Sequence, residues 1–84
     1  MAAVEVYVTS YCGYCVRAED LLRRKGVAFR VIDVTDDPEK RAWLVQATGR
    51  RTVPQIFIGG RSVGGYQDIA ALDRRGELDP LLEA

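Results

Sequence analysis

The stretch Val4–Cys15, with the sequence VEVYVTSYCGYC, joins an apolar segment to two closely spaced cysteines. Its valines alternate with Glu5 and Tyr7, and this period of two predicts a β-strand over Val4–Val8. A helical pattern follows. We therefore expect the cysteine pair at the point where a strand passes into the N-terminus of a helix.

The segment after the cysteines has the spacing of a helix that runs to Lys25. Val16, Leu21 and Leu22 recur at helical intervals, and basic residues gather in the last turn, where they complement the negative end of the helix dipole. Gly26 can adopt the left-handed conformation that ends a helix.

The next segment repeats the order of strand and then helix. Phe29–Val34 alternates like the first strand. Asp37 is a suitable N-cap, and Pro38 is suited to the first helical position. We expect this helix to run to about Thr48, with Gly49 ending it.

The remaining sequence predicts a hairpin followed by a helix. Val53–Ile58 and Arg61–Val63 are predicted strands, joined by the tight turn Gly59-Gly60. A third helix is expected over about Asp68–Arg75, and Asp79-Pro80 repeats the capping signal before the last turn.

The resulting order, β-α-β-α-β-β-α, predicts an α/β fold. A right-handed crossover makes the first two strands parallel, and the hairpin adds two antiparallel strands, giving a four-stranded mixed sheet with helices on both faces. The 84 residues, 48% of them apolar, predict one small domain over residues 1–84.

Composition also restricts the partners. Twelve basic residues balance twelve acidic ones, so no electrostatic footprint indicates nucleic acid or an anionic membrane. The first residues lack the basic and apolar regions of a secretory signal, and no segment is long enough to cross a bilayer. We expect a cytoplasmic protein, a monomer, whose partners are thiols or disulfides.

The cysteine pair has three possible roles. Zinc usually needs four Cys or His ligands, and this chain has two cysteines and no histidine. A structural disulfide between Cys12 and Cys15 would close a very short loop and stabilise little. In the cytoplasm, a close pair at a helix start favours a redox site.

Helix geometry predicts different roles for the two sulfurs. Cys12 should lie at the helix start, near free backbone N–H groups that favour the thiolate, the form that attacks disulfides. Cys15, almost one turn further on, should face inward. We expect Cys12 to be the nucleophile, and Cys15 or a solution thiol to resolve the mixed disulfide that it forms.

Three separated motifs together resemble the dithiol glutaredoxins, and the likeness spans essentially the whole chain. They are Cys12-Gly13-Tyr14-Cys15, Thr52-Val53-Pro54 and Gly64-Gly65-Tyr66-Gln67-Asp68, and the ending Leu78-Asp79-Pro80-Leu81-Leu82 is similar to that of bacterial members. The resemblance implies a thioredoxin fold and glutathione as the reductant.

The resemblance also implies how glutathione is bound near the nucleophile. Pro54 would follow a cis peptide bond, and the backbone of Val53 would pair with the cysteine of glutathione. Proline is the residue for which a cis bond costs little. On its own, Pro54 would be interpreted as an ordinary edge-strand proline.

The segment from Gly64 to Asp68 is implied to hold the γ-glutamyl end of glutathione. Glycines such as Gly65 let a ligand approach the backbone, and a helix start offers N–H donors to a carboxylate. By resemblance, the N–H groups of Gln67 and Asp68 would bind the carboxylate, and the Asp68 side chain would bind the ammonium. Without the resemblance, Asp68 is equally well interpreted as an N-cap.

The remaining contacts of the family fall on Tyr14, Thr52, Tyr66 and Arg41. A guanidinium at Arg41 can grip the glycine carboxylate of glutathione, although most such arginines are simply solvated. Many glutaredoxins place a lysine three residues before the nucleophile, whereas this chain has Thr9 there.

Four other aromatic residues are interpreted as core: Tyr7, Phe29, Trp43 and Phe57.

Gly13 stands where the family most often has proline, so the turn should be looser. Some glutaredoxins with a small residue there bind an iron–sulfur (2Fe-2S) cluster between two subunits, which suggests an alternative role as a cluster carrier with Cys12 as ligand.

A second alternative is a redoxin recycled by thioredoxin reductase. The leading expectation is a glutathione-dependent oxidoreductase that reduces protein disulfides and glutathione mixed disulfides, with ribonucleotide reductase a client typical of the family.

Overall fold

Strand β1, Val4–Val8, lies inside the sheet and pairs on both sides. The computed structural model, which describes all 84 residues, pairs β1 in parallel with β2, Arg30–Asp33, and antiparallel with β3, Gln55–Ile58. Strand β4, Arg61–Gly64, extends the sheet beside β3, so the order is β2-β1-β3-β4. The expected four-stranded mixed sheet is confirmed.

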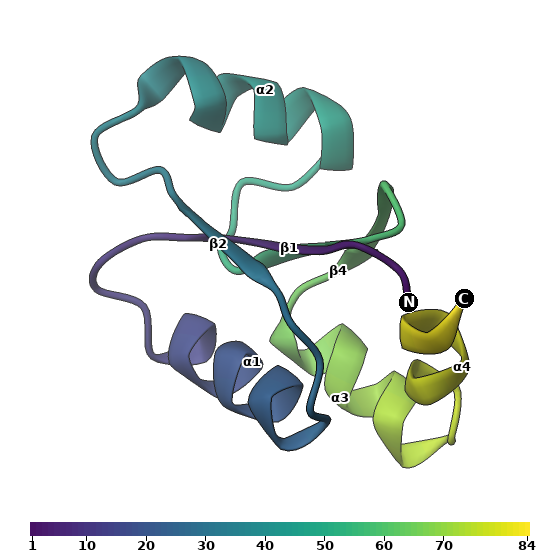
Figure 1. Ribbon diagram of the computed structural model, residues 1–84. Coiled ribbons are helices and arrows are strands. Elements are labelled where there is room, and N and C mark those ends of the chain that lie inside the picture. The colour runs from purple at the N-terminus through teal and green to yellow at the C-terminus, as the bar shows by residue number, and fades with distance from the viewer.

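Helices cover both faces of this sheet (Figure 1). Helix α1, Gly13–Arg24, and helix α3, Tyr66–Arg74, pack together on one face, and α2, Pro38–Thr48, lies on the other. A short helix that the sequence did not delimit, α4, Leu78–Glu83, follows α3 and brings the two chain termini close together (Figure 1).

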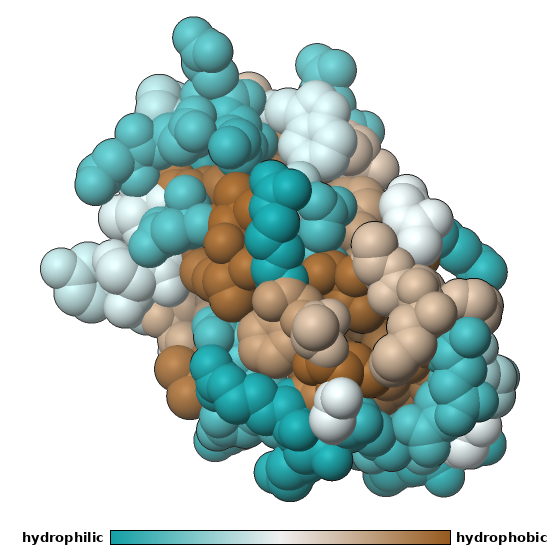
Figure 2. Space-filling view, in the orientation of Figure 1, coloured by the Kyte–Doolittle hydropathy of each residue, from teal (hydrophilic) through white to brown (hydrophobic).

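The alternation of β1 sends its side chains into two separate cores. Val6 packs with Ile56 and Leu22 in the larger core, on the side of α1 and α3. Tyr7 points to the opposite face, where it packs with Phe57 in the smaller core beneath α2. Figure 2 shows apolar side chains in a band across the middle of the molecule, with polar side chains above and below.

Local signals for helix ends and turns agree with the structure. The Asp37 carboxylate accepts a hydrogen bond from the Lys40 N–H at 3.0 Å, and Gly49 ends α2 in the left-handed conformation. Gly59 and Gly60 both have positive φ, as a two-residue hairpin turn requires. These predictions are confirmed.

Three boundaries differ from expectation by more than one residue. Strand β3 begins at Gln55 rather than Val53, because Pro54 has no N–H to donate to the ladder. Helix α3 begins at Tyr66, so Asp68 is its third residue and not its N-cap. Helix α4 begins before Asp79, which lies in its first turn.

Two apolar residues are more exposed than their types suggest. Val16 is 56% exposed because it lies on the outer side of α1. The prediction of a core role for Trp43 is wrong, since its side chain is 50% exposed. Its ring stacks on Phe57 with centroids 5.9 Å apart, and α2 leaves its other side open to solvent.

No helix is long and apolar enough to cross a membrane.

Candidate active site at the start of α1

Cys12 is the N-cap of α1. Its extended backbone, with φ −124° and ψ 105°, brings the chain into the helix, whose first bond joins the Val16 N–H to the Cys12 carbonyl. The Cys12 sulfur accepts a hydrogen bond from the Cys15 N–H at 3.1 Å. Its thiol donates to the Val53 carbonyl at 3.5 Å, so the sulfur faces the loop before β3.

The two thiols have different surroundings, as expected. Cys15 is 2% exposed within the larger core, whereas Cys12 is only partly buried. Burial, and next the hydrogen bond with Cys12, raise the pKa of the Cys15 thiol to about 12. At neutral pH, Cys15 is therefore a neutral thiol beneath an accessible Cys12.

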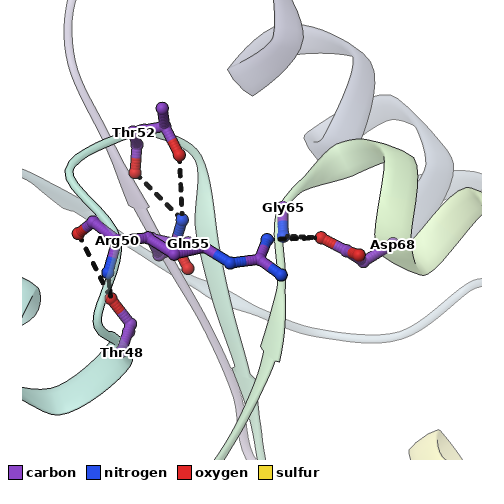
Figure 3. A network of polar contacts seen from close by, with 6 residues as sticks. All are labelled: Thr48, Arg50, Thr52, Gln55, Gly65 and Asp68. Atoms are coloured by element: carbon purple, nitrogen blue, oxygen red, sulfur yellow. Dashed lines mark hydrogen bonds and ion pairs between the residues drawn. The ribbon is translucent and has the colours of Figure 1, made fainter.

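The loop that faces Cys12 is held by a buried amide. The peptide bond between Val53 and Pro54 is cis, which confirms the expectation. Gln55, with no exposed surface, donates from Nε2 to the Thr52 carbonyl at 3.0 Å and to the Thr52 hydroxyl at 3.4 Å (Figure 3). This side chain anchors the turn from inside the protein.

A hollow of about 270 Å³ opens beside this loop. It is lined by Tyr14, Arg50, Thr52, Val53, Pro54, Gly65, Tyr66, Gln67 and Asp68. The rings of Tyr14 and Tyr66 form one part of its wall, with centroids 6.2 Å apart. The structure thus brings together residues from three distant parts of the chain, including every predicted glutathione residue except Arg41.

The N-terminus of α3 closes one end of the hollow. The first helical bond joins the Ile69 N–H to the Gly65 carbonyl, so the N–H groups of Gln67 and Asp68 precede it, as an anion-binding helix start requires. Gly64 has φ +100°, and a Cβ there would collide with the Asp68 carboxylate. The close approach of β4 to α3 therefore requires glycine.

The Asp68 carboxylate has two partners, both on Oδ2. They are the Gly65 N–H at 2.8 Å and Nη1 of Arg50 at 2.7 Å (Figure 3). The Gly65 N–H, and then Arg50, lower the pKa of the Asp68 carboxyl group. Oδ1 makes no hydrogen bond or ion pair, so it is free to accept a cation.

Arg41 lies in a second, adjoining hollow of about 180 Å³, where it is exposed. The two hollows share Arg50, Thr52 and Val53. Arg41 thus lies beside the predicted glutathione site, in a hollow that Asp68 does not line.

Arg50 is the site residue that sequence reasoning missed. Its position two residues before Thr52-Val53-Pro54, in the basic pair Arg50-Arg51, was the available signal. Its partner Asp68 is eighteen residues away, so no local pattern links them.

No group of three or more Cys, Asp or Glu side chains is placed to hold a metal ion, and histidine is absent.

Comparison with known proteins gives consistent results. The glutaredoxin family model matches residues 4–63. A glutaredoxin of Pseudomonas aeruginosa is 51% identical over 84 residues, covering all of both chains. Glutaredoxin 3 of Escherichia coli is 48% identical, covering 99% of this chain and all of the relative. A buckwheat glutaredoxin, solved in complex with glutathione, superposes with a TM-score of 0.90 at 35% identity, covering 98% of this chain and 77% of that one.

Proposed function

The chain belongs to the glutaredoxin family, a family of thiol–disulfide oxidoreductases, and from this premise we propose that it uses glutathione to reduce disulfides through Cys12. Its preferred substrates would be mixed disulfides between glutathione and protein thiols, together with protein disulfides. Thiol–disulfide exchange in general follows from family membership, and the use of glutathione is the proposal.

One observation carries the glutathione assignment. The Cys12 sulfur faces the Val53 carbonyl at the edge of a hollow whose far end is the N-terminus of α3. Glutathione has a thiol in the middle, an ammonium and a carboxylate on its γ-glutamyl end, and a second carboxylate on glycine. The site offers matching groups: N–H donors and the Asp68 carboxylate at the start of α3, and Arg41 in the adjoining hollow.

The reaction on a glutathionylated client would proceed in two exchanges. The Cys12 thiolate attacks the glutathione sulfur of the mixed disulfide, the client thiolate leaves and takes a proton, and Cys12 is left bonded to glutathione. A second glutathione thiolate then attacks the bound glutathione sulfur. Oxidised glutathione leaves, and the Cys12 thiolate is restored. Overall, one free glutathione thiol is oxidised and one client thiol is released, because the other half of the oxidised glutathione comes from the mixed disulfide itself.

Reduction of a protein disulfide would also use Cys15. Cys12 first forms a mixed disulfide with the client, and Cys15, losing its proton, attacks the Cys12 sulfur and releases the second client thiol. Burial holds Cys15 protonated until that step, because its pKa is raised to about 12. Two glutathione molecules then reduce the Cys12–Cys15 disulfide.

The decisive test compares cysteine variants with a small glutathione mixed disulfide, glutathione, glutathione reductase and NADPH. We expect Cys15→Ser to keep most of the activity, since the first pathway needs only Cys12. Cys12→Ser should lose it. The reverse pattern would contradict the assigned roles, and no turnover by the wild type would contradict glutathione dependence.

The reductant distinguishes this proposal from a redoxin recycled by thioredoxin reductase. Replacing glutathione and its reductase with thioredoxin reductase and NADPH should support little reduction of the protein. Rapid reduction by that enzyme, with none by glutathione, would favour the alternative.

A cluster-bridged dimer is the other alternative, suggested by Gly13. The residues fit it in one respect: Cys12 is accessible and Cys15 is buried, so each chain would offer one cysteine ligand. Protein purified anaerobically with glutathione should then show visible absorbance and the mass of a dimer. A colourless monomer would exclude this role.

A cytoplasmic location and reduction of ribonucleotide reductase remain predictions. Glutathione keeps thiols reduced in the cytoplasm, which is the condition that the proposed cycle needs. Cell fractionation and a reconstituted reductase assay would test them.

A further inference from the structure

The strongest unexplained contact at the site is the ion pair that crosses it. Arg50 lies in the loop after α2, and its side chain extends to Asp68 in the first turn of α3 (Figure 3). The two side chains are 50% and 42% exposed, so the pair lies at the rim of the hollow that both of them line.

The base of Arg50 is held firmly by α2. Its N–H donates to the Thr48 hydroxyl at 3.1 Å, and that hydroxyl donates to the Leu44 carbonyl at 2.8 Å, within the last turn of the helix. Because the backbone of Arg50 is tied to α2 and its guanidinium to α3, the side chain connects two walls of the hollow that no backbone hydrogen bond joins.

The far end of the ion pair fixes one oxygen of Asp68. Arg50 and the Gly65 N–H both bind Oδ2, which leaves Oδ1 without a partner. These two contacts hold the Asp68 side chain in one rotamer before a ligand binds. It can therefore accept an ammonium group without paying the entropy cost of ordering the side chain.

We propose that Arg50 is a positioning residue for the γ-glutamyl end of glutathione, acting through Asp68, which it holds oriented at the start of α3. This inference rests on the proposed glutathione-dependent function and names one determinant of its specificity. Arg50 does not displace the ligand from Asp68, because a free oxygen remains for the ammonium.

The test compares Arg50→Gln with a matched control, Arg61→Gln. Arg61 lies on β4, lines a hollow on the other side of Asp68, and makes no ion pair with it. Both variants therefore lose a positive charge near Asp68, but only Arg50→Gln also loses the ion pair with Asp68. We expect Arg50→Gln to raise the KM for the glutathione mixed disulfide about three- to fivefold, as for an exposed ion pair, with kcat unchanged. Arg61→Gln should change neither the KM nor kcat. Arg50→Lys, which keeps the positive charge, should have a KM close to that of the wild type.

Two further measurements separate positioning from simple loosening of the loop. With cysteinylglycine in place of glutathione in the mixed disulfide, the γ-glutamyl group is missing, so Arg50→Gln should have no effect on kcat/KM. In an Asp68→Asn background, Arg50→Gln should add nothing to the KM.

Each contrary result has a distinct meaning. An unchanged KM in Arg50→Gln, or an equal loss with both substrates, would overturn the role of Arg50 while the wild-type activity upheld the proposed function. Wild-type protein that does not turn over with glutathione would overturn both.

Discussion

Asp68 shows how a partly exposed residue is made functional by its backbone surroundings. The third position of α3 brings its carboxylate to the Gly65 N–H, and that contact is the largest cause of its lowered pKa. Arg50 is the second cause, and Arg61, Arg75 and Glu77 line the hollow on the other side. The carboxylate therefore remains ionised well into the acid range.

The lowered pKa predicts a pH dependence of stability. As pH falls, Asp68 takes up a proton at a higher pH in the unfolded chain than in the folded chain. The stabilisation that its carboxylate gives to the fold is therefore complete above the unfolded pKa of 3.8, and it is lost as pH falls through the lower pKa of the folded state. Urea titrations of wild type and Asp68→Asn should show a constant difference in unfolding free energy from pH 7 to 5, and a shrinking one below about pH 4. A difference independent of pH would contradict this account. Asp68→Ala should also raise the KM for the glutathione mixed disulfide.

At the scale of elements, the start of α1 has a backbone suited to proline although glycine is present. Gly13 is the first helical residue, and a Cβ built there meets no atom within 4 Å. The preceding residue, Cys12, has the extended φ and ψ that a following proline demands. Proline at this position loses no helical hydrogen bond.

Gly13→Pro should therefore stabilise the protein, by about 0.4–1 kcal/mol, because it restricts the unfolded chain without straining the folded one. Thermal unfolding of the reduced protein measures the effect, and Gly13→Ala is the control for removal of glycine alone. A melting temperature below that of the wild type would mean that the turn at Cys12 needs the freedom of glycine.

Elements with local signals were predictable, and contacts between them were not. Asp37-Pro38, Gly49 and Gly59-Gly60 act through their own backbone, so sequence indicates them directly. The family motifs similarly located the residues that line the hollow. Arg50 was missed because its partner lies on another element. Trp43 was misplaced because its ring packs on Tyr7 and Phe57 at the edge of the smaller core, and residue type does not reveal which aromatic side chains of a helix lie at such an edge.

At the scale of the whole molecule, the active site rests on one core. Cys15 belongs to the larger core together with Val6, Ile56 and Ile69, so α1, α3 and the strands beneath them, which position Cys12 and Asp68, pack on the same side chains. A chain of this length has little stability to spare. Damage far from Cys12 should therefore lower the amount of active protein without altering the chemistry.

Helix α4 provides the clearest test of this dependence. Leu82 is 2% exposed in the larger core, and its carbonyl accepts the Ala2 N–H at 3.1 Å, which ties the two ends of the chain together. Leu82→Ala should cost about 2–5 kcal/mol, a large share of the total for a domain of this size. Urea unfolding should show a lower midpoint with an unchanged slope, whereas Val16→Ala, on the exposed side of α1, should change little. The KM of the folded Leu82→Ala protein for the glutathione mixed disulfide should equal that of the wild type, since Leu82 does not line the hollow. Equal, small effects of the two substitutions would show that α4 packs too weakly to support the core, and that the site is stabilised by the sheet, α1 and α3 alone.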